Sequence, residues 1–325
     1  MENIAKGAAV SGQMKFPVAI HGAGALGTFF ACRLGQGGCR VTLIARGARL
    51  RALQVDGLRF SDARGAVRQP CAFSGDPSAA AQAALVILAV KSWQLEGALA
   101  DLAPHLAPGT AVLTLQNGVD APAIAARVLP GHPVLAGIVH GFFNLDHDGV
   151  VRHAGVAPRL IAGIHTGDGA AHLAQLRGAL ARTATHCDIV ADIKTELWRK
   201  MMLACAVGGL GAAYDRPAGW LRTEARAELI ALLEEAVGVA RAAGAKLGEA
   251  DVAATLAFID SFPPDATTSM QRDIVAGRSS EFDSQNGALK RWARRLQVLT
   301  PVNERVLDLI GQRWDAYVSS EGAAI

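Results

Sequence analysis

The sequence predicts an α/β domain with a doubly wound parallel sheet, followed by an all-α domain. Three observations support this prediction. An apolar run near the start ends in the spaced glycines Gly22, Gly24 and Gly27. Apolar runs of strand length then alternate with helical patterns up to about residue 190, and from Asp192 onward helical periodicity dominates. Alternating strands and helices are typical of a parallel sheet, whereas a helix-only region indicates a separate domain.

The composition favours a globular protein with two hydrophobic cores. Of the 325 residues, 51% are hydrophobic and 19% are charged, so each domain can bury a core of its own. The net charge is only +3, and the basic residues form no concentrated block. The cluster Arg291, Arg294 and Arg295 is therefore expected to be a solvated helix face, and no nucleic-acid partner is expected.

Cysteines and apolar stretches indicate a cytoplasmic protein without a metal site or a membrane span. The five cysteines are dispersed and include no Cys-x-x-Cys pair, which favours a reducing compartment. The longest apolar stretch, residues 201–213, is too short and too glycine-rich to cross a bilayer. Residues 1–15 lack the apolar core of a signal peptide and are expected to form a flexible extension. The expected domains are then 16–191 and 192–325.

The first domain begins with the pattern of a dinucleotide-binding turn. Gly22 permits a tight turn, Gly24 lets the backbone approach a pyrophosphate, and Gly27 lets the following helix pack on the strand. The pyrophosphate would bind N–H groups at the positive end of that helix. The alternative is a plain strand-to-helix turn. The expected cofactor-binding residues are Gly22, Ala23, Gly24, Ala25, Leu26 and Gly27.

The end of the second expected strand, Arg40–Arg46, indicates which dinucleotide binds. An NAD-preferring site has an acidic residue near this strand end, which bonds the ribose 2′-hydroxyl. Here the position holds Arg46, and Arg49 and Arg51 follow. A guanidinium can pair with a 2′-phosphate through two hydrogen bonds, so NADP(H) is the expected cofactor. The alternative is an arginine that is simply exposed in a loop.

Two further strands are expected to bring polar residues to the ligand-binding edge of the sheet. Ala84–Val90 is a continuous apolar run that leads into Lys91, and Thr110–Leu115 leads into Asn117. The carboxyl ends of parallel strands in a doubly wound sheet face the ligand crevice. Both side chains are therefore candidates for contact with a ligand.

The remaining elements follow from periodicity and from helix start and stop signals. In the first domain we expect helices over 95–106 and 121–129, a strand over 134–139, and a hairpin formed by 150–153 and 159–164. In the second domain we expect helices over 192–213, 223–243, 249–260, 266–276, 281–296 and 301–317.

Several motifs together resemble those of one family, although none is specific alone. In order along the chain they are Gly22–Gly27, Val90–Gln94, Gln116–Gly118, Glu196–Lys200, Ser269–Met270 and Glu281–Asp283. From Gly22 to about Ile310, the chain resembles the ketopantoate reductase (2-dehydropantoate 2-reductase) family. The resemblance implies a Rossmann-like NADP-binding domain followed by a helical domain that carries the catalytic residues.

The resemblance implies the residues of a hydride-transfer reaction. Reduction of a 2-oxo acid places negative charge on the carbonyl oxygen, which an ammonium group can stabilise and protonate. By its match to the family, Lys200 would be this general acid, and Glu281 would hold it in place near the cofactor ribose. Asn117 and Ser269 would contact the substrate carboxylate.

The resemblance also implies cofactor contacts outside the glycine motif. Arg46 and Lys91 match cofactor-binding positions of the family. Asn117 would also touch the nicotinamide end of the cofactor, and Glu281 would lie near its ribose. Phe142 falls where the family offers backbone near the nicotinamide.

Each catalytic or substrate-binding candidate also has a purely structural interpretation. Lys200 could pair with Glu196 one turn earlier on a helix surface. Glu281 could be an acidic residue favoured at a helix start. Asn117 could be a turn residue in left-handed geometry, and Ser269 could simply cap a helix.

Three positions depart from the pattern of the family and bear on the substrate. Ala204 and Gly208 lie one and two helical turns after Lys200, where family members carry asparagines that bind the substrate. Ala266 replaces a third asparagine, which reaches the distal hydroxyl. A site without these hydrogen bonds should discriminate poorly for a hydroxylated tail. We therefore expect a bulkier or more apolar 2-oxo acid, or weak binding of ketopantoate.

The sequence thus predicts an NADPH-dependent reductase of a small 2-oxo acid, with ketopantoate and pantothenate biosynthesis as the first candidates. The substrate is expected in a cleft between the two domains. A reductase of another 2-oxo acid, a non-catalytic NADP-binding sensor and an interaction scaffold are the alternatives. The apolar faces of the helical domain would suit either an internal core or a homodimer.

Overall fold

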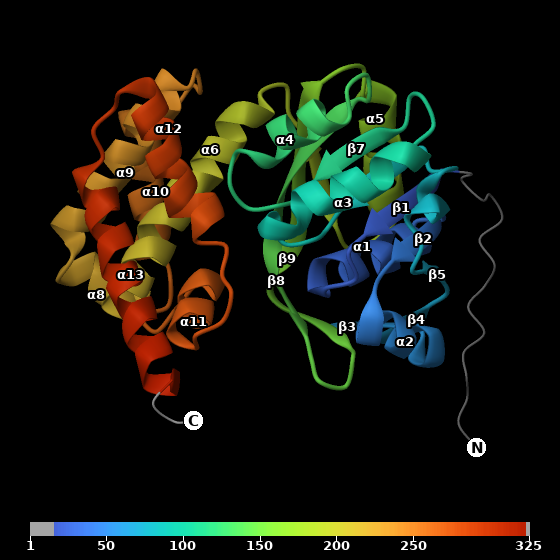
Figure 1. The fold of residues 1–325 in the computed structure, drawn as a ribbon, viewed down its shortest axis with the longest axis horizontal. Helices are drawn as coiled ribbons and strands as arrows, with labels where there is room; N and C mark the ends of the chain where they lie inside the picture. Colours follow the sequence, from blue (N-terminus) through green and yellow to red (C-terminus); the bar gives the residue numbers. More distant parts are fainter. Residues whose placement is uncertain (1–15, 323–325) are drawn as a thin grey trace. The chain divides into compact units, whose positions relative to one another are not determined.

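The computed structural model describes residues 16–322, so the extension expected over residues 1–15 lies outside the described residues. The described chain forms two compact units, one built around a sheet and one built of helices (Figure 1). Of the described residues, the first unit contains 16–90, Gln94–Leu115 and Ile124–Ala191. The second contains Lys91–Trp93, Gln116–Ala123 and 192–322.

One sheet of ten strands organises the first unit. Its centre is a parallel series in which β5 (Ala72–Ser74), β2 (Arg40–Ile44), β1 (Pro17–His21), β6 (Leu85–Leu88) and β7 (Ala111–Thr114) are neighbours. Next to β7 lies β8 (Val134–Leu145), also parallel. This strand order is that of a dinucleotide-binding doubly wound sheet, which confirms the predicted fold class.

The sheet continues beyond β8 through antiparallel and mixed pairs. β9 (Val151–Thr166) pairs antiparallel with β8 and parallel with both β3 (Leu58–Asp62) and β10 (His186–Ile189), and β4 (Gly65–Gln69) pairs antiparallel with β3. The hairpin predicted from 150–153 and 159–164 is wrong, because both segments belong to the single strand β9. Its true partner is β8, which is longer than the predicted strand over 134–139.

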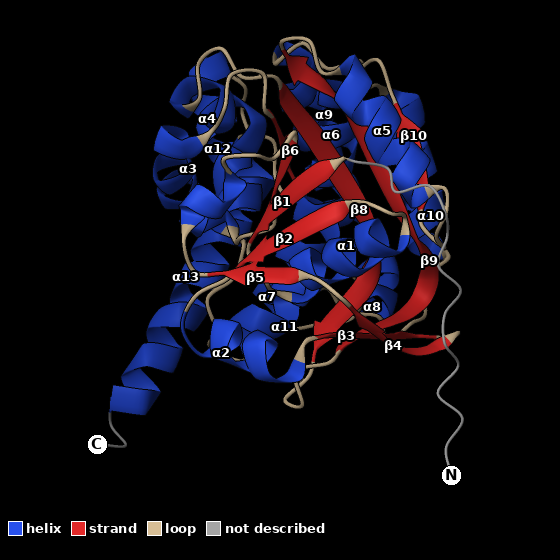
Figure 2. Ribbon diagram, turned by 90° about the vertical axis from the view of Figure 1, so that its right-hand side faces the viewer, coloured by secondary structure: helices blue, strands red, loops and turns tan. Residues whose placement is uncertain are grey.

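Helices pack on both faces of the central strands because side chains alternate along each strand. Val18 and Ile20 point to the face that packs α1 (Ala25–Gln36) and α5 (Ala170–Leu180) in one apolar cluster. Figure 2 shows α1 and α5 on one side of β1 and β2, with α3 (Leu95–Leu102) on the other.

Several helices of the first unit differ from the predicted ones. The helix expected over 95–106 ends as an α-helix at Leu102, because Pro104 in the following 3₁₀ turn, η3 (Ala103–His105), has no N–H to continue it. The helix expected over 121–129 is α4 (Ala121–Val128). The sequence patterns did not predict α2 (Gly47–Asp56) or α5. Short 3₁₀ turns also occur at η1 (Pro77–Ala80) and η2 (Ser92–Gln94).

The second unit is helical and has its own apolar core. Its helices are α6 (Ile193–Leu203), the π-helical turn η4 (Ala204–Gly209), α7 (Leu210–Tyr214), α8 (Ala218–Thr223), α9 (Arg226–Ala242), α10 (Glu249–Asp260), α11 (Ser269–Val275), the π-helical turn η5 (Asp283–Gly287), α12 (Ala288–Leu296) and α13 (Pro301–Gly322). Helices therefore occur in all six predicted regions. Among residues 16–322, none of these helices combines the length and the hydropathy needed to cross a bilayer.

Local signals fix some helix ends of the second unit. Asp192 caps α6, since its carboxylate accepts a hydrogen bond from the Thr195 N–H at 3.0 Å. Gly244 adopts a φ of 88° just after α9 and ends it. Thr223, which the pattern suggested as the start of a helix, is instead the last residue of α8.

Candidate functional site

The glycine motif forms a tight turn between β1 and α1. Gly22 has a φ of 109°, and a Cβ there would lie 2.8 Å from the backbone of Ala89. A Cβ on Gly27 would overlap the carbonyl oxygen of Gly22. Gly24 caps α1 and faces open space, since a Cβ there would have no neighbour within 4 Å. This turn therefore excludes side chains on the protein side and leaves room for a ligand at the start of the helix.

Two arginines follow β2, and they have different surroundings. Arg46 is the N-cap residue of α2, and its guanidinium forms an exposed ion pair with Asp101 of α3. Arg49 donates hydrogen bonds to the carbonyl oxygens of Ala23 (2.9 Å) and Gly149 (3.3 Å) and to the hydroxyl of Thr28 (3.1 Å). The guanidinium of Arg49 thus braces the glycine turn directly. The sequence motif did not indicate that Arg49 contacts the turn, or that Asp101 pairs with Arg46.

His21, the last residue of β1, lies buried at the start of the glycine turn. Both of its ring nitrogens lack a hydrogen-bond partner among the described residues. Burial lowers the pKa of His21 to about 4, and the nearby positive charge of Arg46 acts in the same direction, whereas Asp101 opposes it. The imidazole is therefore neutral at physiological pH.

In the second unit, the segments after β6 and β7 meet the segment around Glu281. The side-chain amide of Asn117 donates a hydrogen bond to the Glu281 carboxylate at 2.8 Å, and the Nζ atom of Lys91 lies 4.0 Å from that carboxylate. Gly118, not Asn117, has the positive φ of this turn, at 100°. A Cβ on Gly118 would overlap the carbonyl oxygen of Ser284, so this close approach requires glycine. The interpretation of Asn117 as a left-handed turn residue is wrong.

Lys200 lies near the end of α6, partly buried in the second unit. Burial lowers the pKa of Lys200 to about 8, and the negative charge of Glu281 partly opposes this shift. Glu196, the partner that the alternative interpretation gives to Lys200, is bound by a neighbouring residue. Glu196 forms an ion pair with Arg199, whose guanidinium also lies 2.9 Å from Asp251. Lys200 and Glu281 are therefore coupled electrostatically, with Asn117 and Lys91 beside the same carboxylate.

Ser269 is the first residue of α11, and its side chain is exposed. The interpretation of Ser269 as a simple helix cap is wrong, because Thr268 caps this helix. The Thr268 hydroxyl accepts a hydrogen bond from the Gln271 N–H at 3.1 Å. The hydroxyl of Ser269 thus has no role in capping α11.

Two of the positions that depart from the family pattern lie in the π-helical turn η4. Ala204 begins this turn, so the α-helical spacing assumed between Lys200 and Gly208 does not hold throughout. A Cβ on Gly208 would lie 2.7 Å from Cε of Met270 and 3.3 Å from the hydroxyl oxygen of Thr268. Position 208 therefore faces the start of α11, next to Ser269, and a larger side chain there would have to displace Met270.

The other two candidate positions lie away from these contacts. Ala266 precedes α11, and its carbonyl oxygen accepts a hydrogen bond from the Ala218 N–H at 2.9 Å. Phe142 lies on β8 opposite Ala154, and 59% of its surface is exposed. Gly141 beside it has a φ of 141°, within an irregularity of the strand pair.

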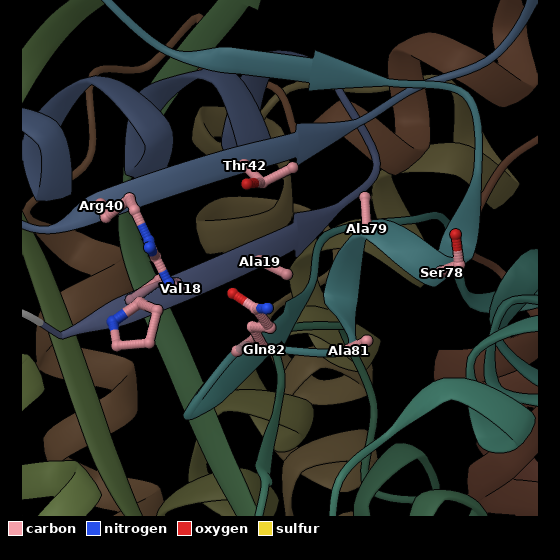
Figure 3. A pocket seen from close by; sticks show the side chains of 10 residues that line it. Val18, Ala19, Arg40, Thr42, Ser78, Ala79, Ala81 and Gln82 are labelled. Atoms are coloured by element: carbon pink, nitrogen blue, oxygen red, sulfur yellow. The ribbon is translucent and has the colours of Figure 1, made fainter.

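A pocket of about 280 Å³ lies at the amino-terminal ends of β1 and β2, the opposite ends from the glycine turn. Figure 3 shows Arg40 and Thr42 of β2 on one side of it, with Ser78 and Gln82 from the segment around η1. None of the candidate residues lines this pocket. Among the side chains that the structure describes, residues 16–313, no group of three or more His, Cys, Asp or Glu is arranged to hold a metal ion.

Comparisons with known proteins agree with the motifs. Residues 18–167 match the family model described as Ketopantoate reductase PanE/ApbA, and residues 192–313 match its C-terminal counterpart. A 2-dehydropantoate 2-reductase from Halobacterium salinarum is 30% identical, over 90% of this chain and 97% of its own length. One from Mycobacterium tuberculosis is 32% identical, over 71% of this chain and 76% of its own.

Solved structures show the same fold. The PanE/ApbA family ketopantoate reductase from Ralstonia eutropha JMP134 superposes with a TM-score of 0.82 at 32% identity, over 92% of this chain and 99% of that one. A D-mandelate dehydrogenase with NADH and anilino(oxo)acetate has a TM-score of 0.80 at 24% identity, over 92% and 99%. The second likeness concerns the fold alone.

Proposed function

The chain belongs to the ketopantoate reductase family of NAD(P)-dependent oxidoreductases, and we propose that it reduces a 2-oxo acid to the 2-hydroxy acid with NADPH, using Lys200 as the proton donor. The family membership makes the chain an oxidoreductase that acts on a CH–OH group. One observation carries the proposal for the mechanism: a partly buried lysine coupled to a carboxylate that also accepts a hydrogen bond from Asn117.

The protonation state of Lys200 suits a general acid. With a pKa of about 8, Lys200 is mostly protonated at neutral pH, yet it releases its proton more readily than an exposed lysine. Nicotinamide supplies the hydride when the cofactor is bound. Negative charge then develops on the carbonyl oxygen, where the Lys200 ammonium stabilises it and donates a proton.

Glu281 and its neighbours would keep Lys200 charged and oriented. The Glu281 carboxylate opposes the effect of burial on the pKa of Lys200. The hydrogen bond from Asn117 fixes one oxygen of this carboxylate. In this proposal Lys200 and Glu281 are the catalytic pair, and Asn117 and Ser269 bind the substrate carboxylate.

The residues of the first unit fit a phosphorylated dinucleotide. A Cβ would fill the glycine turn on its protein side, while the face at Gly24 is open at the start of α1. Arg46 stands at the end of β2, where an acidic residue would favour NAD. We propose that the residues 22–27, Arg46 and Lys91 hold NADPH, and that Phe142 contributes backbone near the nicotinamide.

Because relatives are named 2-dehydropantoate 2-reductase, ketopantoate is the first substrate to test. Its reduction would give pantoate for pantothenate biosynthesis. A different 2-oxo acid is favoured by a specific observation. Position 208 has no side chain of its own, and its neighbour Met270 is apolar. The solved D-mandelate dehydrogenase shows that the fold also serves another 2-hydroxy acid. Ala204, Gly208 and Ala266 would then define a more apolar substrate site.

A direct test follows NADPH absorbance as the purified protein is mixed with ketopantoate and with a panel of apolar 2-oxo acids. We expect turnover of at least one acid and a loss of about 10²- to 10⁴-fold in kcat for Lys200→Ala, the usual contribution of a positioned acid. Lys194→Ala is the matched control, because Lys194 lies on the same helix but is exposed.

The outcomes separate the candidate functions. Preferred turnover of ketopantoate would support the family activity, whereas turnover of the apolar acids alone would identify a reductase of another substrate. NADPH binding without turnover of any acid would favour the non-catalytic sensor. An unchanged kcat in Lys200→Ala would contradict the role of Lys200. A homodimer and a cytoplasmic location remain predictions from the sequence.

A further inference from the structure

Both members of the proposed catalytic pair stand next to a π-helical turn. Lys200 lies four residues before η4, and Glu281 lies two residues before η5. A π-helical turn interrupts the regular α-helical hydrogen bonds and leaves backbone groups available to other partners. Such turns are frequent at functional sites.

Asn286 of η5 connects the two turns. It is completely buried, and its side-chain amide donates hydrogen bonds to the carbonyl oxygen of Cys205 in η4, at 3.2 Å, and to the side-chain oxygen of Asn303, at 2.9 Å. The Asn303 amide in turn donates to the carbonyl oxygen of Asn286 at 3.1 Å. Asn303 is itself held by Glu235 of α9, whose carboxylate accepts from the Asn303 backbone N–H at 2.9 Å.

The backbone around Asn286 is shaped to admit this side chain. A Cβ on Gly209, the last residue of η4, would lie 2.6 Å from the amide nitrogen of Asn286, so only glycine fits there. The side-chain oxygen of Asn286 has no hydrogen-bond partner among the described residues. A buried polar group with an unmade hydrogen bond costs stability, so burial energy alone does not explain an asparagine at this position.

We propose that Asn286 is a positioning residue. It links η4, which follows Lys200, to η5, which follows Glu281, and so fixes the position of the Lys200 ammonium relative to the Glu281 carboxylate. Asn286 is held by its hydrogen bonds with Asn303, which is in turn held by Glu235. The inference rests on the proposed roles of Lys200 and Glu281 but not on the identity of the substrate. Its prediction is that loss of the amide at position 286 disturbs the chemical step rather than cofactor binding.

The test is Asn286→Leu, which keeps the branched shape and approximate volume but removes both amide hydrogen bonds. We expect kcat to fall by about 10- to 100-fold, as when a group that orients an active residue is lost. The KM for NADPH should change less than twofold. The alkaline limb of the pH profile of kcat/KM should also shift, because the distance between Lys200 and Glu281 changes.

Ile259→Ala is the matched control for a general loss of stability. Ile259 is completely buried in α10, a helix that packs on α8 and α9. This variant should unfold at lower temperature yet keep the kcat and the pH profile of the wild type. An unchanged kcat and pH profile in Asn286→Leu would overturn the inference, and so would an equal loss of kcat in Ile259→Ala.

Two further measurements keep the inference testable in every case. If Asn286→Leu does not fold, Asn303→Ala takes its place as the test. This variant keeps the hydrogen bond from Asn286 to the carbonyl oxygen of Cys205, so kcat should fall by less than the roughly 10- to 100-fold expected of Asn286→Leu. An unchanged kcat in Asn303→Ala would count against the inference. A ¹³C NMR titration of Lys200 needs no substrate. If the wild type turns over no acid but the pKa of Lys200 is shifted in Asn286→Leu, only the proposed function is refuted. If the wild type is active and the pKa of Lys200 is not shifted in Asn286→Leu, only the inference is refuted.

Discussion

The glycine turn of the first unit and the lysine–glutamate cluster of the second are built in opposite ways. The turn spans residues 22–27 and depends on missing side chains, because Gly22 and Gly27 touch backbone where a Cβ would go. The cluster depends on side chains brought together from distant segments. Asn117 and Glu281 are 164 residues apart in sequence. The first site should therefore fail through sterics, and the second through charge and orientation.

The largest effect is expected from steric disruption of the turn by Gly27→Ala. The new methyl group would overlap the Gly22 carbonyl oxygen and separate α1 from β1. We expect a destabilisation of about 3 kcal/mol, the upper end for overpacking, together with loss of NADPH binding. Thermal unfolding and NADPH fluorescence measure the two effects.

Gly24→Ala and Gly97→Ala separate these effects. Gly24 faces open space, so Gly24→Ala should weaken NADPH binding without lowering the unfolding temperature. Gly97 lies within α3 and also faces open space, so its replacement by alanine should leave binding unchanged. Normal NADPH binding by Gly27→Ala would show that the turn tolerates a side chain.

The second largest effect is expected from Glu281→Gln in the cluster. Because Glu281 raises the pKa of Lys200 against the effect of burial, its neutralisation should lower that pKa below about 8. Only protonated Lys200 can donate a proton, so the alkaline limb of kcat/KM should move to lower pH. We expect kcat itself to fall by about 10- to 100-fold.

Glu196→Gln is the control for this prediction. Glu196 lies on the same helix as Lys200 but pairs with Arg199. Its neutralisation should leave the alkaline limb in place. A limb that stays fixed in Glu281→Gln, or one that moves equally in Glu196→Gln, would show that Glu281 does not tune Lys200.

The same contrast explains what the sequence could predict. The turn was predictable because its determinants lie within six consecutive residues, and Gly22 and Gly27 each have a steric reason. The positions of β6 and β7 were predictable because buried parallel strands are continuous apolar runs, although both strands are shorter than the runs. The long strand β9 was predicted as two pieces, because its polar middle interrupts the alternation. The helix α5 was overlooked because its short, alanine-rich sequence is only weakly amphipathic.

The contacts of the cluster were less predictable. The positions of Lys200, Glu281 and Asn117 came from a family resemblance, and no local pattern shows that Asn117 bonds Glu281. The π-helical turns η4 and η5 have no periodicity of their own within a helical segment. The pair Gly208 and Gly209 was the available signal, because two glycines inside a helix indicate close contacts on both sides. Asn286 lies within the segment 281–287, but the resemblance gives it no role, and Arg49 belongs to no motif of the resemblance.

A third prediction concerns His21, the buried histidine at the start of the glycine turn in the first unit. His21 is neutral in the folded state with a pKa of about 4, whereas an unfolded histidine has a pKa of about 6.5. The unfolded state therefore binds the additional proton first as the pH falls. Stability should decline below pH 6.5 and stop declining, for this group, near pH 4. Between pH 7 and 4.5 the protonation of His21 should lower the free energy of unfolding by about 2 to 3 kcal/mol.

Urea unfolding at pH 7 and 4.5 measures this contribution. His21→Leu should lose less stability than the wild type between the two pH values. His147→Leu is the control, because His147 is exposed in the same unit and its replacement should leave the difference intact. An equal loss of stability in the wild type and in His21→Leu would mean that another group governs the acid sensitivity.

The smallest effect is expected at the ion pair between Arg46 and Asp101. If Arg46 binds the 2′-phosphate as proposed, the Asp101 carboxylate would compete with that phosphate for the Arg46 guanidinium and would also repel it. Both side chains are largely exposed, so the pair is worth at most about 1 kcal/mol. Asp101→Asn should therefore tighten NADPH binding by no more than about fivefold and leave NADH binding unchanged.

A double-mutant cycle shows whether this gain acts through Arg46. Arg46→Gln alone should weaken NADPH binding and leave NADH binding nearly unchanged, because only NADPH carries the 2′-phosphate. In the Arg46→Gln background, Asp101→Asn should bring a smaller gain, since only the direct repulsion of the phosphate is then relieved. The same gain in both backgrounds would show that Asp101 acts on the phosphate alone. The glycine turn would then fix where the dinucleotide binds. Arg46 and Asp101 would each act on the 2′-phosphate independently of the other, and together they would set the preference for NADPH over NADH.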